Sequence, residues 1–320
     1  MLPNALRSLL RPLRPLIPQS IQRIREMHVV KKHAAQKGLE LIHYDLFFDL
    51  RRNNTVLRIR NSHRIYLTHM IDNFDYYVDS VIPLHLNGTT IVDMSGPRYH
   101  RLKGFGDIPF LFPSHTEPYD TTAEYLDFAA LKEGDIVLDI GAYSAVTSII
   151  FSQLVGDRGH VYAFEADETN HGCAQINIEM AARVLGLKNI SLLHRAVWSN
   201  NDGLLFSNEG AMGSSAVSIT GGKRGDEREV PSILLQDFFA AHELDRADFV
   251  KIDIEGGEIE VLGASANFLK RVNARLIVEP HLVGGTMSTE RCCQLLQSAG
   301  YRVHIRKKVG ESEPLIEAVP

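Results

Sequence analysis

The chain of 320 residues has few of the features that mark several large classes of protein. Its three cysteines are Cys173, Cys292 and Cys293, and an odd number with one adjacent pair fits neither a disulfide framework nor a zinc site. The longest uncharged apolar run near the core, residues 144–155, is far too short to span a membrane. A net charge of −5 argues against nucleic acid as the main partner. We therefore expect a globular, cytoplasmic protein without a transmembrane segment.

The charge is unevenly distributed, because residues 1–39 hold eight Lys or Arg and a single acidic residue. Pro12, Pro15 and Pro18 recur at every third position there and would interrupt an amphipathic helix. We predict that residues 1–40 form a basic, partly disordered arm. Weak contact of this arm with an anionic membrane surface is the alternative, and no pattern indicates an oligomeric state.

The most informative feature that is present is an apolar strand that runs into a small-residue turn, residues 137–143. A helical stretch follows, and a second apolar strand then ends in Phe164-Glu165-Ala166-Asp167. Gly141 allows the backbone to approach a ligand closely, and the helix after it offers N–H groups to an anion. Glu165 follows Gly141 by 24 residues and can accept both hydroxyls of a ribose. The two motifs predict a site for a ligand that contains ribose.

The same turn lacks the glycines with which dinucleotide sites hold a pyrophosphate. It reads Gly141-Ala142-Tyr143-Ser144-Ala145, with one glycine where the G-x-G-x-x-G pattern has three. No G-x-x-x-x-G-K-[ST] loop occurs in the chain either. A nicotinamide dehydrogenase is therefore disfavoured. A cofactor without phosphates fits better, and S-adenosylmethionine (SAM) offers a carboxylate to the helix and a ribose diol to Glu165.

A second signature lies about a hundred residues further on, Lys251-Ile252-Asp253-Ile254-Glu255-Gly256-Gly257-Glu258. Together with Asp139-Ile140-Gly141-Ala142, the 164–167 strand end and Ala196-Val197, it resembles the FkbM family of SAM-dependent methyltransferases. The resemblance covers about residues 120–285. It implies a class I methyltransferase fold and O-methylation of a hydroxyl on a sugar, glycan or secondary metabolite. The chain departs from the family at Ala145, where a second glycine is common; a methyl group there is tolerated in a helical residue but narrows the space for the methionine end.

Strands and helices alternate regularly from residue 121. The expected strands are residues 136–140, 160–165, 190–197, 248–254 and 274–279, with edge strands at 301–307 and 315–319. This alternation predicts an α/β fold with a Rossmann-like, doubly wound and mainly parallel sheet. We assign residues 121–320 to the SAM-binding domain and residues 41–120 to an N-terminal α+β cap. Acceptor selectivity is expected from the cap and from the polar interruption at 199–229.

Within the cap, residues 55–60 and 64–68 are expected to pair as a hairpin. Residues 72–81 are expected to form a helix, and residues 89–94 a strand. In the interruption, Gly213-Ser214-Ser215 is either close to the ligand or a plain turn.

Ligands of parallel sheets bind at the carboxyl ends of the strands, and several candidate residues fall at such ends. The candidate cofactor contacts are Asp139, Gly141, Ala142, Tyr143, Glu165, Ala166, Ala196, Val197 and Asp253. Trp198 either stacks on the cofactor's base or packs against the fold.

The catalytic candidates are Asp253, Glu279 and His281. Asp253 either removes the proton of the acceptor hydroxyl or holds the cofactor's ammonium, and His281 is either a base near neutral pH or a simple loop histidine. With Glu255 these residues would supply an oxygen-rich site for a divalent metal, but the spacing does not require an ion and no metal is assigned.

Two other classes of function remain open. A methyltransferase of proteins or nucleic acids is the first, although base aminomethylases show [DN]-P-P-[YF] where this chain has Asp-Ile-Glu-Gly. A non-catalytic SAM-fold binding module is the second, and Ala145 keeps it open. We expect a small-molecule or carbohydrate acceptor, whose identity no pattern gives.

Overall fold

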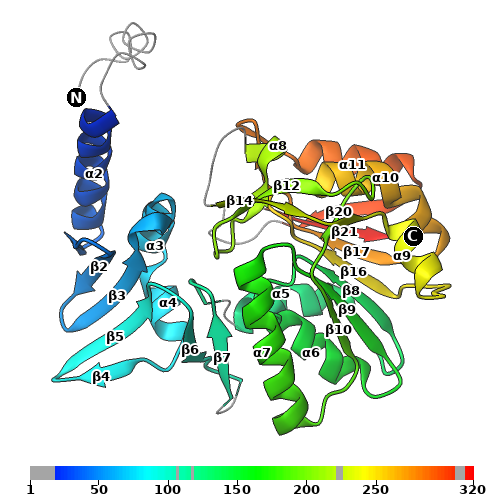
Figure 1. Cartoon of the computed structure of the whole chain (residues 1–320), viewed down its shortest axis with the longest axis horizontal. Helices are drawn as coiled ribbons and strands as arrows, with labels where there is room; N and C mark the ends of the chain where they lie inside the picture. The colour runs from blue at the N-terminus through cyan, green and yellow to red at the C-terminus, as the bar shows by residue number, and fades with distance from the viewer. Residues whose placement is uncertain (1–18, 106–107, 117–118, 221–225, 307–313) are drawn as a thin grey trace, which may run out of the picture. The chain divides into compact units, whose positions relative to one another are not determined.

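The structure is a computed structural model that describes residues 19–105, 108–116, 119–220, 226–306 and 314–320 (Figure 1). Contacts within the chain divide it into two compact units. The first unit ends at Ser95, apart from a short excursion at residues 79–82, and the second continues from Gly96. The boundary thus lies before the expected position at residue 120. The reason is that the strand at residues 109–112 packs on the second unit, where Leu111 exchanges two hydrogen bonds with the side chain of Asn177.

The first unit contains a five-stranded sheet with the order β1-β2-β3-β5-β4. Its elements are α2 (Gln19–Gln36), β1 (Glu40–His43), β2 (Phe47–Arg52), β3 (Thr55–Arg60), β4 (Leu84–Leu86) and β5 (Thr89–Met94). The α2 helix replaces part of the predicted disordered arm, because the stretch after Pro18 contains no proline. The rest of the predicted arm, residues 1–18, lies outside the described residues.

The hairpin predicted in the cap is wrong in its second strand, residues 64–68. β3 pairs with β2 in antiparallel register and with β5 in parallel register, and the chain directly after β3 is helical. It forms η2 (Asn61–Tyr66), α3 (Leu67–Asp72) and α4 (Phe74–Ser80). The buried residues Leu67, Met70 and Ile71 follow the i, i+3, i+4 spacing of a helix, so burial of this face overrides the strand-like alternation before it.

The second unit contains a seven-stranded sheet with the order β10-β9-β8-β16-β17-β21-β20. The strands are β8 (Ile136–Ile140), β9 (His160–Phe164), β10 (Ile190–Leu193), β16 (Phe249–Ile252), β17 (Arg275–Val278), β20 (Arg302–Arg306) and β21 (Leu315–Val319). The first five in this order are parallel, and β21 is antiparallel to both of its neighbours. This confirms the doubly wound, mainly parallel sheet of a class I methyltransferase fold. The place of β21 differs from the prediction, since it lies inside the sheet rather than at its edge.

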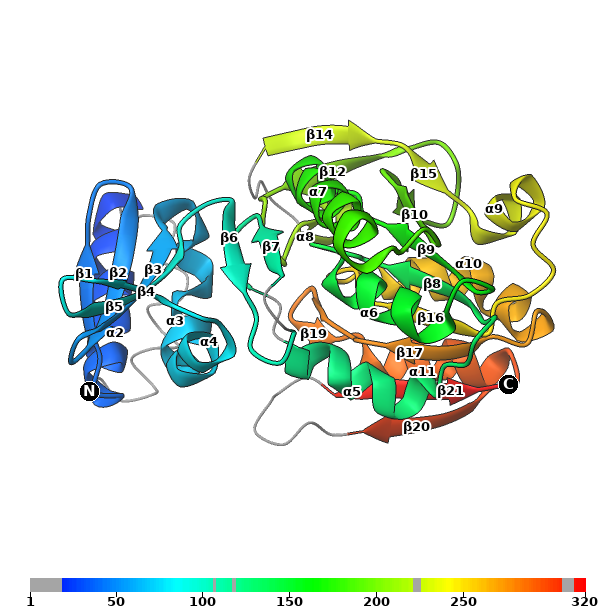
Figure 2. The same cartoon turned by 90° about the horizontal axis from the view of Figure 1, so that it is seen from below.

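Helices cover both faces of this sheet (Figures 1 and 2). One face carries α5 (Tyr119–Ala129), α6 (Val146–Val155) and α7 (Glu168–Leu185), and the other carries α9 (Leu235–Ala241), α10 (Glu258–Arg271) and α11 (Thr289–Ser298). Two buried apolar clusters fill the layers, one around Phe151 and Phe249 and one around Phe238 and Leu262. Within the described residues, no helix is both long and apolar enough to cross a membrane.

The predicted third strand, residues 190–197, is divided in two. After β10 the strand is interrupted at residues 194–195, and β11 (Ala196–Val197) then pairs with β15 (Ser232–Ile233) in a separate two-stranded sheet. Between them, the polar interruption forms a small antiparallel sheet. Its elements are β12 (Leu204–Asn208), β13 (Ser215–Ala216) and β14 (Asp226–Val230), with α8 (Val217–Thr220). Short two-stranded ladders also join β6 (Arg98–Arg101) to β7 (Pro109–Phe112) and β18 (Leu282–Val283) to β19 (Thr286–Met287).

Candidate functional site

Three strand ends meet at the carboxyl edge of the large sheet. Because β8 lies between β9 and β16, the motifs that follow these strands are brought side by side. The Gly141 N–H donates to the Phe164 carbonyl across 3.0 Å, and the Asp253 N–H donates to the Ile140 carbonyl across 3.0 Å. The two signatures, about a hundred residues apart in the sequence, therefore form one site.

The first turn, residues 141–145, is shaped by close contact with the neighbouring strand end. Gly141 has a φ of +88°, and a Cβ atom there would lie 1.8 Å from the carbonyl oxygen of Asp253. A residue with a side chain cannot occupy this position without moving the backbone. The Tyr143 N–H donates to Oε2 of Glu165 across 2.7 Å, so the turn is also fastened to the end of β9.

Ala145 ends the first turn in a conformation that the sequence did not predict. Its φ of +62° and ψ of 19° are left-handed, and α6 begins at the next residue. The condition under which alanine is expected to be tolerated there, a helical conformation, is therefore not met. A left-handed conformation costs a non-glycine residue about 1–2 kcal/mol, so the turn holds local strain at this residue.

Glu165 lies at the end of β9, with 6% of its surface exposed. Its Oε2 accepts the Tyr143 N–H, and its Oε1 accepts the Asp167 N–H across 2.8 Å. Burial, together with the nearby Asp167 carboxylate, raises the pKa of Glu165 to about 8. A carboxylate has roughly four lone-pair positions, so each oxygen retains capacity for a ligand hydroxyl. The alternative of a solvated surface acid does not fit this burial.

A buried ion pair connects the first turn to β16. Asp139 is fully buried, and its Oδ2 accepts the Ser148 hydroxyl across 2.6 Å. The Nζ of Lys251 lies 3.2 Å from Oδ1 of Asp139 and 3.5 Å from Oδ2 of Asp253, and it donates to the Gly141 carbonyl across 2.7 Å. The sequence motif contains Lys251 but gives it no role, because these partners become visible only once the strands are paired.

The second turn, residues 253–258, is built around a buried carboxylate. Glu258 is fully buried at the start of α10, and its Oε1 accepts an N–H of its own turn and contacts Nδ1 of His281 at 2.9 Å. Asp253 and Glu255 keep 26% and 29% of their side chains accessible. Two carboxylates of this turn are thus partly accessible, and the third is buried.

His281 is surrounded by these three carboxylates. Its Nε2 lies 3.6 Å from Oδ1 of Asp253 and 3.7 Å from Oε1 of Glu255, while its Nδ1 faces Glu258. Burial alone lowers the pKa of His281, but the carboxylates of Glu255, Glu258 and Asp253 together raise it well above its usual value. The structure therefore makes His281 a buried cation near neutral pH and does not support its predicted role as a base.

Glu279, the third catalytic candidate, follows β17 at the same edge of the sheet. Its Oε2 accepts a hydrogen bond from the hydroxyl of Tyr125 on α5 across 2.8 Å.

The carbonyl oxygen of Ala166, beside Glu165, lies 3.1 Å from Nε2 of His194. Within the part of the chain that the structure describes, no three His, Cys, Asp or Glu side chains form a group that could hold a metal ion.

The residues assigned to the base of the cofactor lie beyond β10. Ala196 and Val197 are both buried in β11, with 8% and 3% exposed. The Trp198 ring lies against the start of α10, where a Cβ atom on Gly257 would come within 2.9 Å of it. Packing is therefore one demonstrated role of Trp198.

Two serines of the polar interruption return to the site. Ser214 donates its hydroxyl to Oδ2 of Asp167 across 2.7 Å, and Ser215 donates to the Glu255 carbonyl across 2.7 Å. Asp167 also caps α7, since its Oδ1 accepts two N–H groups of the first helical turn. The Gly213–Ser215 stretch is thus more than a plain turn, because it ties the end of β9 to the second turn.

The segment before α5 also reaches the first turn. The Tyr143 hydroxyl donates to the His115 carbonyl across 2.7 Å. The Oγ of Ser144 and the Oγ1 of Thr116 are buried without a hydrogen-bond partner among the described residues. Buried polar atoms normally have partners, so these hydroxyls fit a ligand with a polar end. Together with the Gly141 backbone and Glu165, they make the first turn compatible with SAM.

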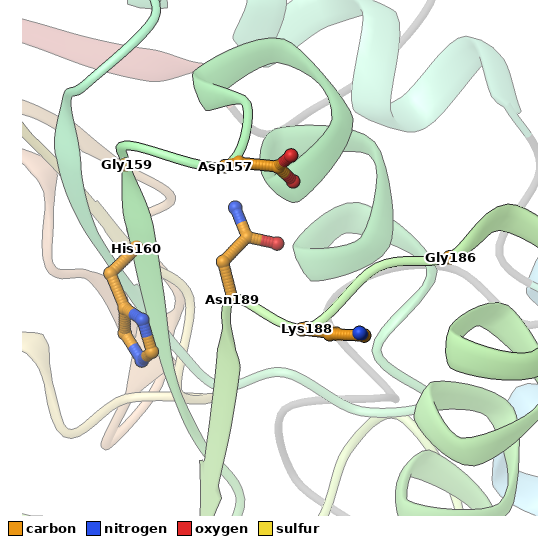
Figure 3. A pocket seen from close by; sticks show the side chains of 6 residues that line it. All are labelled: Asp157, Gly159, His160, Gly186, Lys188 and Asn189. Carbon is orange, nitrogen blue, oxygen red and sulfur yellow. The ribbon is translucent and has the colours of Figure 1, made fainter.

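A pocket of about 360 Å³ lies at the opposite edge of the sheet, at the amino ends of β9 and β10 (Figure 3). It is lined by Asp157, Gly159, His160, Gly186, Lys188 and Asn189. The Asn189 amide is already bonded to the Ser152 and Gly156 carbonyls and to the Ser152 hydroxyl. Ligands of open parallel sheets bind at the carboxyl ends, so this pocket is not the candidate site.

Comparison with known proteins gives a family match over residues 139–303, to the family described as Methyltransferase FkbM domain. A curated protein-L-isoaspartate O-methyltransferase from Methanosarcina mazei is 32% identical over 100 residues, which cover 30% of this chain and 39% of that protein. The match therefore spans about two fifths of the relative's length.

Solved structures of methyltransferases are similar at low identity. The methyltransferase FkbM of Methylobacillus flagellatus KT is 13% identical with a TM-score of 0.44, covering 59% of this chain and 47% of that one. The precorrin-6y C5,15-methyltransferase of Geobacter metallireducens GS-15 is 17% identical with a TM-score of 0.40, covering 64% and 90%.

Proposed function

The chain belongs to the FkbM methyltransferase family, and from this premise we propose that it methylates a hydroxyl group of a sugar, glycan or secondary metabolite with SAM as the donor. The observation that carries the proposal is the meeting of the first turn, Glu165 and the second turn at one sheet edge. When bound, SAM supplies a methyl group on a sulfonium sulfur.

The first turn and the end of β9 hold the cofactor in this proposal. The first turn lies beside the methionine end, and the buried hydroxyl of Ser144 offers it a hydrogen bond. Glu165 accepts the ribose hydroxyls while its backbone partners keep the carboxylate oriented. Ala196 and Val197 border the adenine, and Ala166 lies between the two regions.

The second turn faces the acceptor. Methyl transfer is an in-line displacement, so it depends mainly on positioning and on exclusion of water. Asp253 accepts the proton or the hydrogen bond of the acceptor hydroxyl, and the His281 cation holds Asp253 and Glu255 in place. Glu279, bonded to Tyr125, supports the same rim.

The charge of this rim favours a hydroxyl over a carboxylate acceptor. Asp253 and Glu255 are partly accessible, and with Glu258 they surround His281, so carboxylates outnumber the cation there and would repel a further carboxylate at close range. A carboxylate acceptor, such as the name of the Methanosarcina mazei relative indicates for that protein, would therefore meet a repulsive rim here. A small-molecule or carbohydrate acceptor with neutral hydroxyls would not.

The proposal is tested by methyl transfer from isotopically labelled SAM to a panel of sugars, glycans and hydroxylated metabolites. Asp253→Ala should lower turnover by about 10²–10⁴-fold and change SAM affinity far less. Glu260→Ala is the matched control, because Glu260 is an exposed acid on the first turn of α10. A larger effect of Asp253→Ala on affinity than on turnover would make Asp253 a cofactor ligand only.

Three outcomes would contradict the proposed reaction. Transfer to proteins but not to small hydroxyl compounds would favour a protein acceptor, and transfer to nucleic acid would overturn the expected partner class. Tight SAM binding without transfer to any acceptor would favour a non-catalytic SAM-binding module.

A further inference from the structure

The side chain of Lys251 contacts both turns of the site through polar distances of 2.7–3.5 Å. It lies within β16 and is 2% exposed. Its Nζ donates to the Gly141 carbonyl in the first turn and lies within ion-pair distance of Asp139 and of Asp253. The Tyr125 ring lies 5.6 Å away on the side of α5. An ammonium group thus stands between the cofactor side and the acceptor side.

Burial of such a group is costly, so its contacts must offset the loss of hydration. Asp139 alone would neutralise the charge of Lys251. The two further contacts, with a turn carbonyl and with the partly exposed Asp253, are not needed for charge balance. They do fix the geometry of the two turns relative to each other.

The contact with Gly141 determines how the first turn is presented. The peptide between Gly141 and Ala142 is planar, so its carbonyl and its N–H point in opposite directions. Lys251 binds the carbonyl, and the Ala142 N–H donates to the Phe164 carbonyl across 2.9 Å. This peptide is therefore held from both sides, and its orientation follows the position of the Lys251 ammonium.

The contact with Asp253 acts on the other turn. Oδ2 of Asp253 faces Lys251, and Oδ1 faces His281. Two cations on opposite oxygens restrict rotation of the carboxylate. Loss of the Lys251 ammonium would release both this carboxylate and the Gly141 peptide at once.

We propose that Lys251 is a positioning residue for the methionine end of the cofactor, acting through the Gly141 peptide and not by contact with the adenosine part. This inference rests on the proposed SAM-dependent function. It predicts a specific split, since the ribose is held by Glu165. The carboxylate of Glu165 is fixed by two backbone N–H groups, and Lys251 has only the smallest of the lowering influences on its pKa.

The test compares binding of SAM, S-adenosylhomocysteine and 5′-methylthioadenosine by calorimetry. The last of these ligands has the adenosine part but lacks the amino and carboxyl groups of methionine. Lys251→Met should weaken SAM and S-adenosylhomocysteine by about 10- to 100-fold, the range for loss of charged hydrogen-bond partners. Affinity for 5′-methylthioadenosine should change by less than about threefold. Lys270→Met is the matched control, because Lys270 also lies over a tyrosine ring, Tyr301, at 5.5 Å, but far along α10.

The single variant leaves Asp139 as a buried carboxylate without its cation. A second variant, Asp139→Asn with Lys251→Met, removes both charges and should show the same split if the single variant does not fold. Equal weakening of all three ligands would overturn the proposal, because Lys251 would then support the whole site. Unchanged binding of all three, or failure of both variants to fold, would overturn it as well.

Failure of the proposed function gives a different result. In that case the unaltered protein would bind none of the adenosyl ligands. If only the positioning role fails, the unaltered protein binds these ligands, and Lys251→Met does not weaken SAM and S-adenosylhomocysteine more than 5′-methylthioadenosine.

Discussion

The first turn and the second turn share one plan, a parallel strand followed by a glycine-containing turn and a helix, but they use charge in opposite ways. At the first turn the carboxylate of Asp139 is fully buried and paired with Lys251. At the second turn, Asp253 and Glu255 remain partly exposed beside the His281 cation, and Asp253 also lies within ion-pair distance of Lys251.

The difference matches the two tasks of the proposed reaction. A cofactor that is the same in every cycle is served by a rigid turn lined with backbone. An acceptor that loses a proton is served by carboxylates at the surface of the site. Changes at the first turn should therefore affect folding and cofactor affinity, and changes at the second turn should affect turnover.

The strongest way to break the first turn is Gly141→Ala. The added Cβ would overlap the Asp253 carbonyl oxygen at 1.8 Å, and the φ of +88° is unfavourable for alanine. Overpacking and backbone conformation together predict a loss of about 2–5 kcal/mol in the free energy of unfolding. Denaturant titration measures this loss.

Gly134→Ala separates the two causes. Gly134 has a similar φ of +92°, but a Cβ atom there meets no atom within 4 Å. Gly134→Ala should therefore lower the free energy of unfolding only by the cost of the backbone conformation, about 1–2 kcal/mol. Equal losses for both variants would show that the close contact between the two turns is not important.

Glu165→Ala tests the cofactor side without disturbing the contact at Gly141. It should weaken SAM binding by about 1–3 kcal/mol through loss of charged hydrogen bonds. Calorimetry on the folded variant measures the change. Unchanged affinity would remove the ribose assignment of Glu165.

The raised pKa of Glu165 predicts that SAM binding depends on pH. Ribose hydroxyls donate to the ionised carboxylate, so SAM should bind about tenfold more weakly for each pH unit below a pKa of about 8. Binding near neutral pH should also release protons, which calorimetry in buffers of different ionisation enthalpy detects. Glu165→Gln should show a flat profile over the same range, and a pH-dependent profile in that variant would assign the dependence to another group.

The same shift affects stability in the absence of ligand. The pKa of Glu165 is higher in the folded protein than its ordinary value of 4.5, so the protonated form favours folding. The contribution of this group is therefore largest at low pH and declines as the pH rises from about 4.5 to about 8.

The smallest expected effect is that of Ala145→Gly. Glycine relieves the left-handed conformation at Ala145 but adds entropy to the unfolded chain. The net result should be a gain of about 0.5–1 kcal/mol in the free energy of unfolding. A loss of stability, measured by the same denaturant titration, would mean that the buried methyl group contributes more by packing than the strain costs.

Much of the second unit could be predicted from the sequence. The bounds of β8 agree with the predicted residues 136–140, because an apolar strand gives a strong local signal. The doubly wound sheet follows from the alternation of strands and helices. The meeting of the two signatures follows in turn from the pairing of β8 with β16.

The parts that could not be predicted depend on contacts between distant residues. Two partners of Lys251, Asp139 and Gly141, lie more than a hundred positions away, and Ser214 and Ser215 reach the site through a separate small sheet. His281 is a base by its ordinary chemistry and becomes a cation only because three carboxylates surround it. In the first unit, burial of Leu67 and its helical neighbours outweighed a local strand pattern.

The measurement that tests the central claim most directly is calorimetric titration of the protein with SAM and S-adenosylhomocysteine, with NAD as the control. The account predicts micromolar binding of both adenosyl ligands and none of NAD. Absence of binding by SAM and S-adenosylhomocysteine, or binding of NAD in their place, would contradict the assignment of the first turn and Glu165 to this cofactor.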